Sequence, residues 1–204
     1  MKFEEKIVFS STGEGVHGGL LGEYTYDSEN NRYVQSNSEI SHEEYEPKYL
    51  SRNDEHEDWF VGTEDGEAGW LWNGNPSQEV PEADWEVLDG EEWNVDPDLK
   101  VSKGALKPCS GIRIFGLGPV VQEQVNHLGI YKLTPRLWNG HPIYQNGDGS
   151  FLHMGSDGYW SVSDRLGEHS IRGLPGRLCP SESNTWEYWD GSKAQPAEIL
   201  VESL

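Results

Sequence analysis

The sequence repeats one short phrase at a distance of about half its length. The segment DWEVLDGEEW (84–93) returns 101 residues later as TWEYWDGSKA (185–194) in a chain of 204 residues. With this offset held, eight of 32 positions are identical between 59–90 and 160–191, where average composition gives about two. Self-similarity at a fixed spacing is the signature of a duplicated structural unit. The sequence therefore predicts two copies of one fold.

The match extends upstream when small gaps are allowed. The segments 8–26 and 114–133 then pair Phe9 with Phe115, Gly22 with Gly129, and Tyr24 with Tyr131. The joint falls near SKGALKPCSG (102–111), whose glycine, proline and serine content is typical of a linker. We therefore expect a first copy at 1–106 and a second copy at 107–204.

The residues of each copy favour β structure. The chain has 24 Gly, 11 Pro and 9 Trp, and its apolar residues alternate over short runs between turn signals. The clearest hairpin is YQNGDGSFL (144–152), whose central Asn, Gly and Asp residues suit the positive backbone angles of a tight turn. Only PVVQEQVNHL (119–128) carries apolar residues at helical spacing after an initial proline. We expect an all-β fold of two tandem homologous modules, each a small sandwich or partly closed barrel of five to seven short strands.

The formal charge is divided unequally between the two copies. Of the net charge of −21, residues 1–106 contribute −19 and residues 107–204 contribute −2. A negative field of this size disfavours nucleic acid and anionic membranes as partners. It favours either a basic protein partner or simple solubility of the acidic copy, and the sequence leaves both open. A charged insertion at about 38–58 predicts a partner-binding surface, formed by Glu43, Glu44, Glu55, Glu57 and Asp58.

Cysteine and histidine spacing shows no metal or redox motif. Cys109 and Cys179 both belong to the second copy, where they could pair, but they do not form CxxC. The seven histidines show no HxxxH or HExxH spacing, so we expect neither a metal nor a cofactor. The N-terminal segment lacks an apolar core of signal length, and no run approaches a membrane span. These features predict a soluble cytoplasmic chain, or a soluble domain excised from a larger protein.

Aromatic residues are more numerous than two small cores require. We expect Trp85, Trp160 and Trp186 to lie in the cores. The second copy also places aromatic and polar side chains beside the Asn-Gly turn at 139–140, where a loop side chain can reach solvent. Aromatic platforms with nearby polar groups hold sugars or peptides in binding modules. The predicted ligand-binding residues are Trp138, Asn139, His141, Tyr144 and Trp189.

Carboxylates also recur in the two copies, as Glu86 with Glu187 and Asp89 with Asp190. A glycosidase needs two carboxylates in one cleft, so an enzyme acting on carbohydrate, with acidic residues between the modules, is an alternative interpretation. Asp followed by Gly at the end of a strand is, however, ordinary turn chemistry. We therefore predict no catalytic residue.

The second copy resembles a Trp-rich module that occurs, often in tandem, in protist, algal and invertebrate proteins. Its pattern is G-x-Y, then N-G-x-P-x-Y, an aromatic hairpin, a G-x-W strand and a later Trp. The residues that fill it are Gly129, Tyr131, Asn139, Gly140, Pro142, Tyr144, Gly158, Trp160, Gly167 and Trp186. The first copy departs from the pattern, since NNRYVQ (30–35) lacks the glycine and the proline. The resemblance implies a β-rich, non-catalytic module and supplies no catalytic residue.

Taken together, these observations predict a non-catalytic binding protein. Its second copy is expected to present an aromatic surface to a carbohydrate or peptide, and its first copy an acidic surface to a basic partner. Two alternatives remain open: the carbohydrate-active enzyme, and an inhibitor or decoy whose acidic face occludes a basic site.

Overall fold

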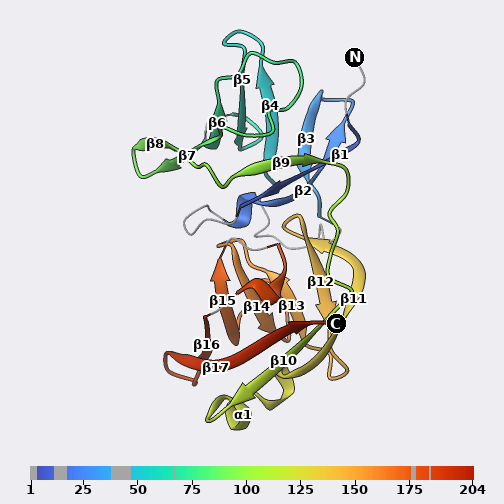
Figure 1. The fold of residues 1–204 in the computed structure, drawn as a ribbon, viewed down its shortest axis with the longest axis vertical. Coiled ribbons are helices and arrows are strands. Elements are labelled where there is room, and N and C mark those ends of the chain that lie inside the picture. Colours follow the sequence, from blue (N-terminus) through green and yellow to red (C-terminus); the bar gives the residue numbers. More distant parts are fainter. Residues whose placement is uncertain (1–3, 12–17, 38–46, 67, 176–177, 184) are drawn as a thin grey trace.

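The computed structural model describes residues 4–11, 18–37, 47–66, 68–175, 178–183 and 185–204. Within them the chain is all-β and forms two sheets, which lie one above the other in Figure 1. The first is an open sheet of nine strands in the order β8-β7-β6-β5-β4-β3-β2-β1-β9, here called the half-barrel. The second is a closed barrel of eight strands, β10 to β17 in sequence order.

The half-barrel consists of β1 (Lys6–Ser10), β2 (Gly22–Asp27), β3 (Arg32–Gln35), β4 (Tyr49–Asn53), β5 (Asp58–Gly62), β6 (Gly69–Asn73), β7 (Glu86–Asp89), β8 (Glu92–Val95) and β9 (Lys100–Lys103). The barrel consists of β10 (Gly111–Leu117), β11 (Gly129–Trp138), β12 (His141–Gln145), β13 (Phe151–Met154), β14 (Tyr159–Ser163), β15 (Ile171–Pro175), β16 (Trp186–Trp189) and β17 (Ala194–Ser203). Helical structure in the described residues is limited to η1 (Gly18–Leu20), α1 (Val120–Glu123), η2 (Val125–His127) and η3 (Pro180–Glu182). None of the described helices is long and apolar enough to cross a membrane.

The strands are more numerous than the five to seven predicted for each copy. Many of them are only four or five residues long, so each presents two or three side chains to the core. A sheet must turn through many such short strands before it can enclose a core, and runs this short are easily overlooked between turns. The segment 119–128, whose apolar residues have helical spacing, forms only the single turns α1 and η2.

The two sheets share their pairing registers. In the half-barrel, Leu50 of β4 lies opposite Val61 of β5. In the barrel, Leu152 of β13 lies opposite Val162 of β14. The hydroxyl of Tyr24 donates to the Leu20 carbonyl at 2.8 Å, and that of Tyr131 donates to the His127 carbonyl at 2.9 Å, both four residues upstream.

One predicted equivalence is wrong by a single residue. Phe9 lies opposite Gly22, and the residue that lies opposite Gly129 is Ile114 rather than Phe115. Phe9 is fully buried, whereas Phe115 is 38% exposed. Because successive side chains of a strand point to opposite faces, a one-residue shift exchanges core and surface.

Each sheet encloses its own core, and the indoles expected there are buried. Trp85 and Trp186 are 0% and 2% exposed. Their N–H groups donate to the carbonyls of Pro81 at 3.0 Å and of Ser183 at 3.1 Å. Trp160 is also fully buried. Buried indoles of this kind combine a large apolar area with a satisfied polar group.

The sheets differ in how they end. The ten-residue strand β17 pairs with β16 through Ala194–Ala197 and with β10 through Glu198–Ser203, which closes the barrel. In the half-barrel the corresponding stretch is split, so that β8 pairs with β7 and β9 pairs with β1. The interruption, 96–99, contains Pro97, which has no N–H to donate to a ladder.

A tight turn of the barrel holds the two sheets together. Asn139 and Gly140 connect β11 to β12 with φ angles of 49° and 72°. The Gly140 carbonyl accepts from the N–H of Glu23 at 2.8 Å, and the Gly140 N–H donates to the Ser36 carbonyl at 2.8 Å. The contact is so close that a Cβ at Gly22 would lie 2.6 Å from the Gly140 oxygen.

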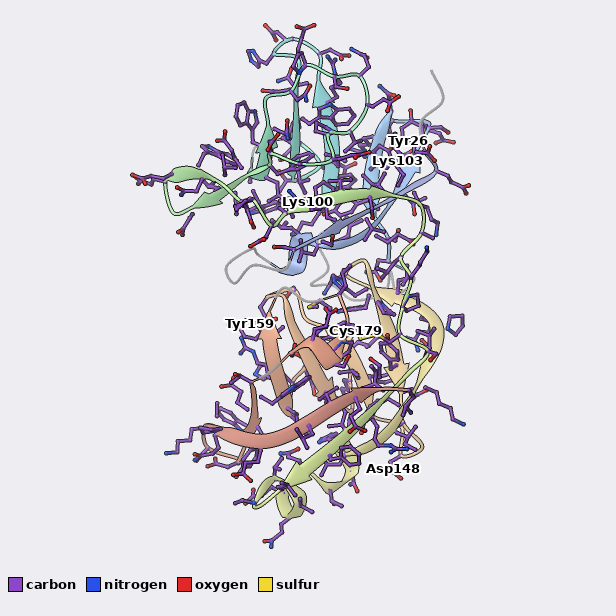
Figure 2. All side chains as sticks on the ribbon, in the orientation of Figure 1. Tyr26, Lys100, Lys103, Asp148, Tyr159 and Cys179 are labelled. Atoms are coloured by element: carbon purple, nitrogen blue, oxygen red, sulfur yellow. A yellow bond between two sulfur atoms is a disulfide. The ribbon has the colours of Figure 1, made fainter. Side chains whose placement is uncertain are left out.

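A disulfide between Cys109 and Cys179 joins residues 70 positions apart. It ties the segment before β10 to the segment before η3, and Figure 2 labels Cys179 on the barrel. The pairing that the sequence left open is therefore present.

Candidate functional site

The predicted ligand residue Trp138 does not reach solvent. It is the last residue of β11, is 5% exposed, and packs with Ile143 and Leu166. The expectation of exposure is wrong because β11 runs up to the turn, which leaves only the residues at 139–140 outside the strands.

Its three predicted neighbours are buried with it near the junction. The Asn139 side chain donates to the Met154 carbonyl at 3.0 Å, and His141 Nδ1 lies 2.8 Å from the Asn139 carbonyl oxygen. His141 and Tyr144 are both fully buried. Burial lowers the pKa of His141 to about 4 and raises the pKa of Tyr144 to about 12. The structure brings these residues together, but they pack in the interior and are not exposed as a ligand platform requires.

The fifth predicted residue, Trp189, is 46% exposed. It ends β16 opposite Ala194, at the tip of the β16–β17 hairpin. The carboxylate of Asp190 accepts from the N–H groups of Ser192 and Lys193 and from the Gln195 side chain. These bonds lower the pKa of Asp190 and fix the hairpin turn, the role that its Asp-Gly sequence indicates.

The predicted acidic insertion is described only in part. Glu43 and Glu44 lie outside the described residues. Glu55 and Glu57 are exposed in the turn between β4 and β5, and Asp58 begins β5. The Asp58 carboxylate accepts from the indole N–H of Trp72 at 2.9 Å.

That bond leads to a face that the sequence analysis did not identify. Leu71 of β6 is fully buried in the core, so its neighbour Trp72 points to the outer face of the half-barrel. Directly opposite Trp72 lie Phe60 of β5 and Glu86 of β7, and opposite Glu86 lies Val95 of β8. These side chains form one row across four strands.

The β7–β8 hairpin extends this row to the sheet edge. Trp93 lies opposite Leu88 and is 43% exposed, and Val95 is 59% exposed. Gly74 leaves the space that the Trp72 ring occupies, because a Cβ there would lie 2.7 Å from its Cη2 atom. We call this surface the aromatic–acidic face; it comprises Asp58, Phe60, Trp72, Glu86, Leu88, Trp93 and Val95.

The segment that forms this face carries one sign of charge. Between Arg52 and Lys100 the sequence contains sixteen Asp and Glu residues and no Lys or Arg. The stretch spans β5 to β8, so the strands that form the face contribute no cation of their own. The sequence carries this charge signal, but the short runs EWNV and GWLWN do not show which residues point inward and which point outward.

Among the described residues, the junction between the two sheets does not offer the pair of carboxylates that a glycosidase needs. A hollow beside the turn is lined by Lys6, Glu23, Thr25, Gln35, Pro135 and Leu137, among others. Glu23 is the one carboxylate among its described lining residues, and it accepts from Lys6 Nζ at 2.7 Å and from the Leu106 N–H at 2.9 Å. A glycosidase needs a pair. The repeated acids Glu86, Asp89, Glu187 and Asp190 lie on the hairpins instead.

In the part of the chain that the structure describes, no group of three or more His, Cys, Asp or Glu side chains is placed to hold a metal ion. Comparison with known proteins also gives no assignment, since no family model, curated protein or solved structure matches this chain. The resemblance of the second copy to the Trp-rich module therefore carries no function to this protein.

Proposed function

We propose that this chain is a non-catalytic binding protein built from two copies of one β unit, and that the aromatic–acidic face of the first copy holds a basic segment of a protein partner. On this proposal, the second copy has a structural role and packs against the first copy through the turn at 139–140.

The duplication is supported by the order of the elements. Each half begins with a strand, passes through short helical structure (η1 in the first half, α1 and η2 in the second), and continues as an antiparallel meander whose indoles occupy matching positions. The boundary proposed at 106 and 107 lies between β9, which ends at Lys103, and β10, which begins at Gly111.

The partner is inferred from the chemistry of the face. A guanidinium or ammonium group over an indole is attracted by the ring, and the attraction grows where water is excluded. The half-barrel already contains such a pair, since Lys48 Nζ lies 4.5 Å from the centre of the Trp70 ring. Trp93 offers the same surface, exposed and without a cation among the strands that flank it. This exposed indole in a field of carboxylates is the observation that carries the proposal.

The proposal is tested with a capped seven-residue peptide of alternating lysine and valine, titrated against the full chain and followed by tryptophan fluorescence and calorimetry. We expect binding that weakens steeply between low salt and roughly 0.5 M salt, where charges are screened within a few ångströms. Trp93→Ala should weaken binding by about tenfold or more.

The matched control is Trp189→Ala, because Trp189 is equally exposed on the hairpin of the near-neutral copy. It should leave the affinity within about twofold. Failure of the wild-type chain to bind the peptide, or equal losses in both variants, would overturn the proposal.

A carbohydrate ligand is a second candidate, and Trp189 is the observation that favours it. Its exposed indole, with Asp190 and Gln195 beside it, offers a flat ring next to polar groups. A glycan array probed with wild type and with Trp189→Ala tests it, and a signal that survives the substitution argues against it.

The disulfide indicates the kind of compartment in which the protein works. Disulfides persist in oxidising compartments and are rare in the cytosol. The bond between Cys109 and Cys179 therefore favours an oxidising environment over the cytoplasm expected from the sequence. Thiol labelling of the protein, isolated without reductant, tests this directly.

A further inference from the structure

The strand β8 forms an edge of the half-barrel. Among the described strands it pairs with β7 alone, and all four of its residues, Glu92–Val95, are exposed. Figure 1 shows the β7–β8 hairpin extending to the left of the half-barrel. An edge strand presents a row of main-chain donors and acceptors that another strand can use.

The register shows which main-chain groups point outward. The Asp96 N–H donates to the Trp85 carbonyl at 2.9 Å, so these residues form a hydrogen-bonded pair. Hydrogen-bonded and non-hydrogen-bonded pairs alternate along an antiparallel ladder. The neighbouring pairs Glu86 with Val95 and Leu88 with Trp93 are therefore non-hydrogen-bonded. Consequently, the N–H and C=O groups of Trp93 and Val95 point away from β7, toward the open edge.

The opposite edge of the same sheet is protected. The strand β9 carries Lys100 and Lys103, which Figure 2 labels, and lysine on an edge strand discourages pairing with another chain. The Val101 N–H is also occupied, since it donates to the Glu82 carbonyl at 2.9 Å. β8 has neither lysine nor proline within it and carries two exposed apolar side chains.

We infer that β8 is a docking edge, and that an extended basic segment of the partner joins the half-barrel there as an additional antiparallel strand. This inference rests on the proposed function and specifies how the partner binds. The main chain of the added strand bonds to Trp93 and Val95, and its side chains alternate between the two faces. Those on the outer face contact the Trp93 ring and Val95, and those on the other face meet Glu92 and Asn94.

Charge selects this occupant over a second copy of the chain. Pairing of β8 with β8 of another copy would bring together two chains, and residues 1–106 of each carry a charge of −19. A basic strand instead gains attraction from Glu92 and from Asp89, Glu91 and Asp96 around it.

Two N-methylated forms of the lysine–valine peptide test the inference. In an antiparallel strand whose lysines lie on the outer face over Trp93, the lysine N–H groups point toward β8 and the valine N–H groups point away. Methylation of the inner lysine amides should therefore weaken binding by about tenfold or more. Methylation of the valine amides should change it by less than about twofold. Amide exchange of Trp93 and Val95 should slow when the unmodified peptide is bound.

Variants of the edge give an independent measurement. Val95→Pro removes one outward N–H and should weaken binding by several-fold beyond Val95→Ala, which keeps it. If Val95→Pro disrupts the hairpin, the methylated peptides still decide the question.

The outcomes separate the inference from the function on which it rests. If the unmodified peptide does not bind, both the proposed function and the added strand are overturned. Binding that tolerates both methylation patterns equally, with unchanged exchange at Trp93 and Val95, leaves the proposed function standing and overturns the added strand. Concentration-dependent self-association through β8, abolished by Val95→Pro, would overturn the choice of partner in favour of a second copy.

Discussion

The half-barrel and the barrel have similar internal pairing but differ at their ends and surfaces. They share strand order, registers and the positions of their core indoles. They differ in closure, charge and covalent bonding: the barrel has a continuous β17 and a disulfide, and the half-barrel has a broken final strand and most of the acidic residues. Similar cores therefore carry unlike surfaces in this chain, and we expect the sites of function where the halves differ.

The largest expected effect tests whether the two cores are equivalent. Trp85→Ala and Trp186→Ala each remove a buried indole, and each should lower the free energy of unfolding of its half by about 3–5 kcal/mol. Urea denaturation, with the halves followed separately by amide NMR signals, measures both losses. A loss below about 1 kcal/mol in one half alone would break the equivalence.

The disulfide should stabilise the barrel alone. Cys109→Ser together with Cys179→Ser opens a loop closed across 70 residues, which should cost about 4 kcal/mol on the chain-entropy account. Calorimetry should show the barrel melting earlier and the half-barrel unchanged. An equal shift of both halves would mean that they unfold as one unit.

Lowering the pH should destabilise the barrel more than the half-barrel. His141 and His153 are buried there, and burial lowers the pKa of each to about 4, whereas an unfolded histidine titrates near 6.5. The unfolded state therefore binds more protons between these values, and stability falls as the pH is lowered from about 6.5 to 4. At pH 5 the loss should be roughly 2 kcal/mol for each histidine.

The readout is the melting of the two halves at pH 7 and pH 5. Acid sensitivity confined to the half-barrel would contradict the assignment to the buried histidines.

The smallest effect concerns the charge of the two hairpins. Glu91→Gln removes an exposed carboxylate from the turn that precedes β8. The association rate with the lysine–valine peptide should fall a few-fold at low salt while dissociation stays nearly constant, since remote charges steer encounter more than they hold the complex. Stopped-flow fluorescence measures both rates. The matched control is Asp190→Asn on the other hairpin, which should leave both rates unchanged.

The all-β class could be predicted from the sequence because alternation and turn residues recur along the whole chain. Trp85 and Trp186 were found as core residues because an identical phrase surrounds them. The Asn-Gly turn at 139–140 was found because few other residues adopt positive φ angles there. Alternation and turn chemistry are local, so a single sequence can reveal them.

The site was harder to predict because it depends on where strands end. Trp138 was expected in a loop, but β11 extends to include it, and one residue of strand length decided its burial. The sequence does not assign Trp72 and Trp93 to the outer face, because an outward indole and an inward one look alike in a short run such as GWLWN. The edge at β8 follows from the break at Pro97, whose consequence appears only once the pairing of the whole sheet is known.

The close contact between Gly22 and Gly140 bears on how this chain can change over time. Each position lacks a side chain, and an added methyl group at Gly22 would fall 2.6 Å from one atom and 2.9 Å from His141 Cε1. The chain therefore has no neutral substitution at Gly22, since even alanine acts as a wedge between its halves. Trp93 and Val95, by contrast, stand in solvent, where many side chains fit. The fold therefore restricts Gly22 to a residue without a side chain, whereas at Trp93 and Val95 the fold itself sets no such limit.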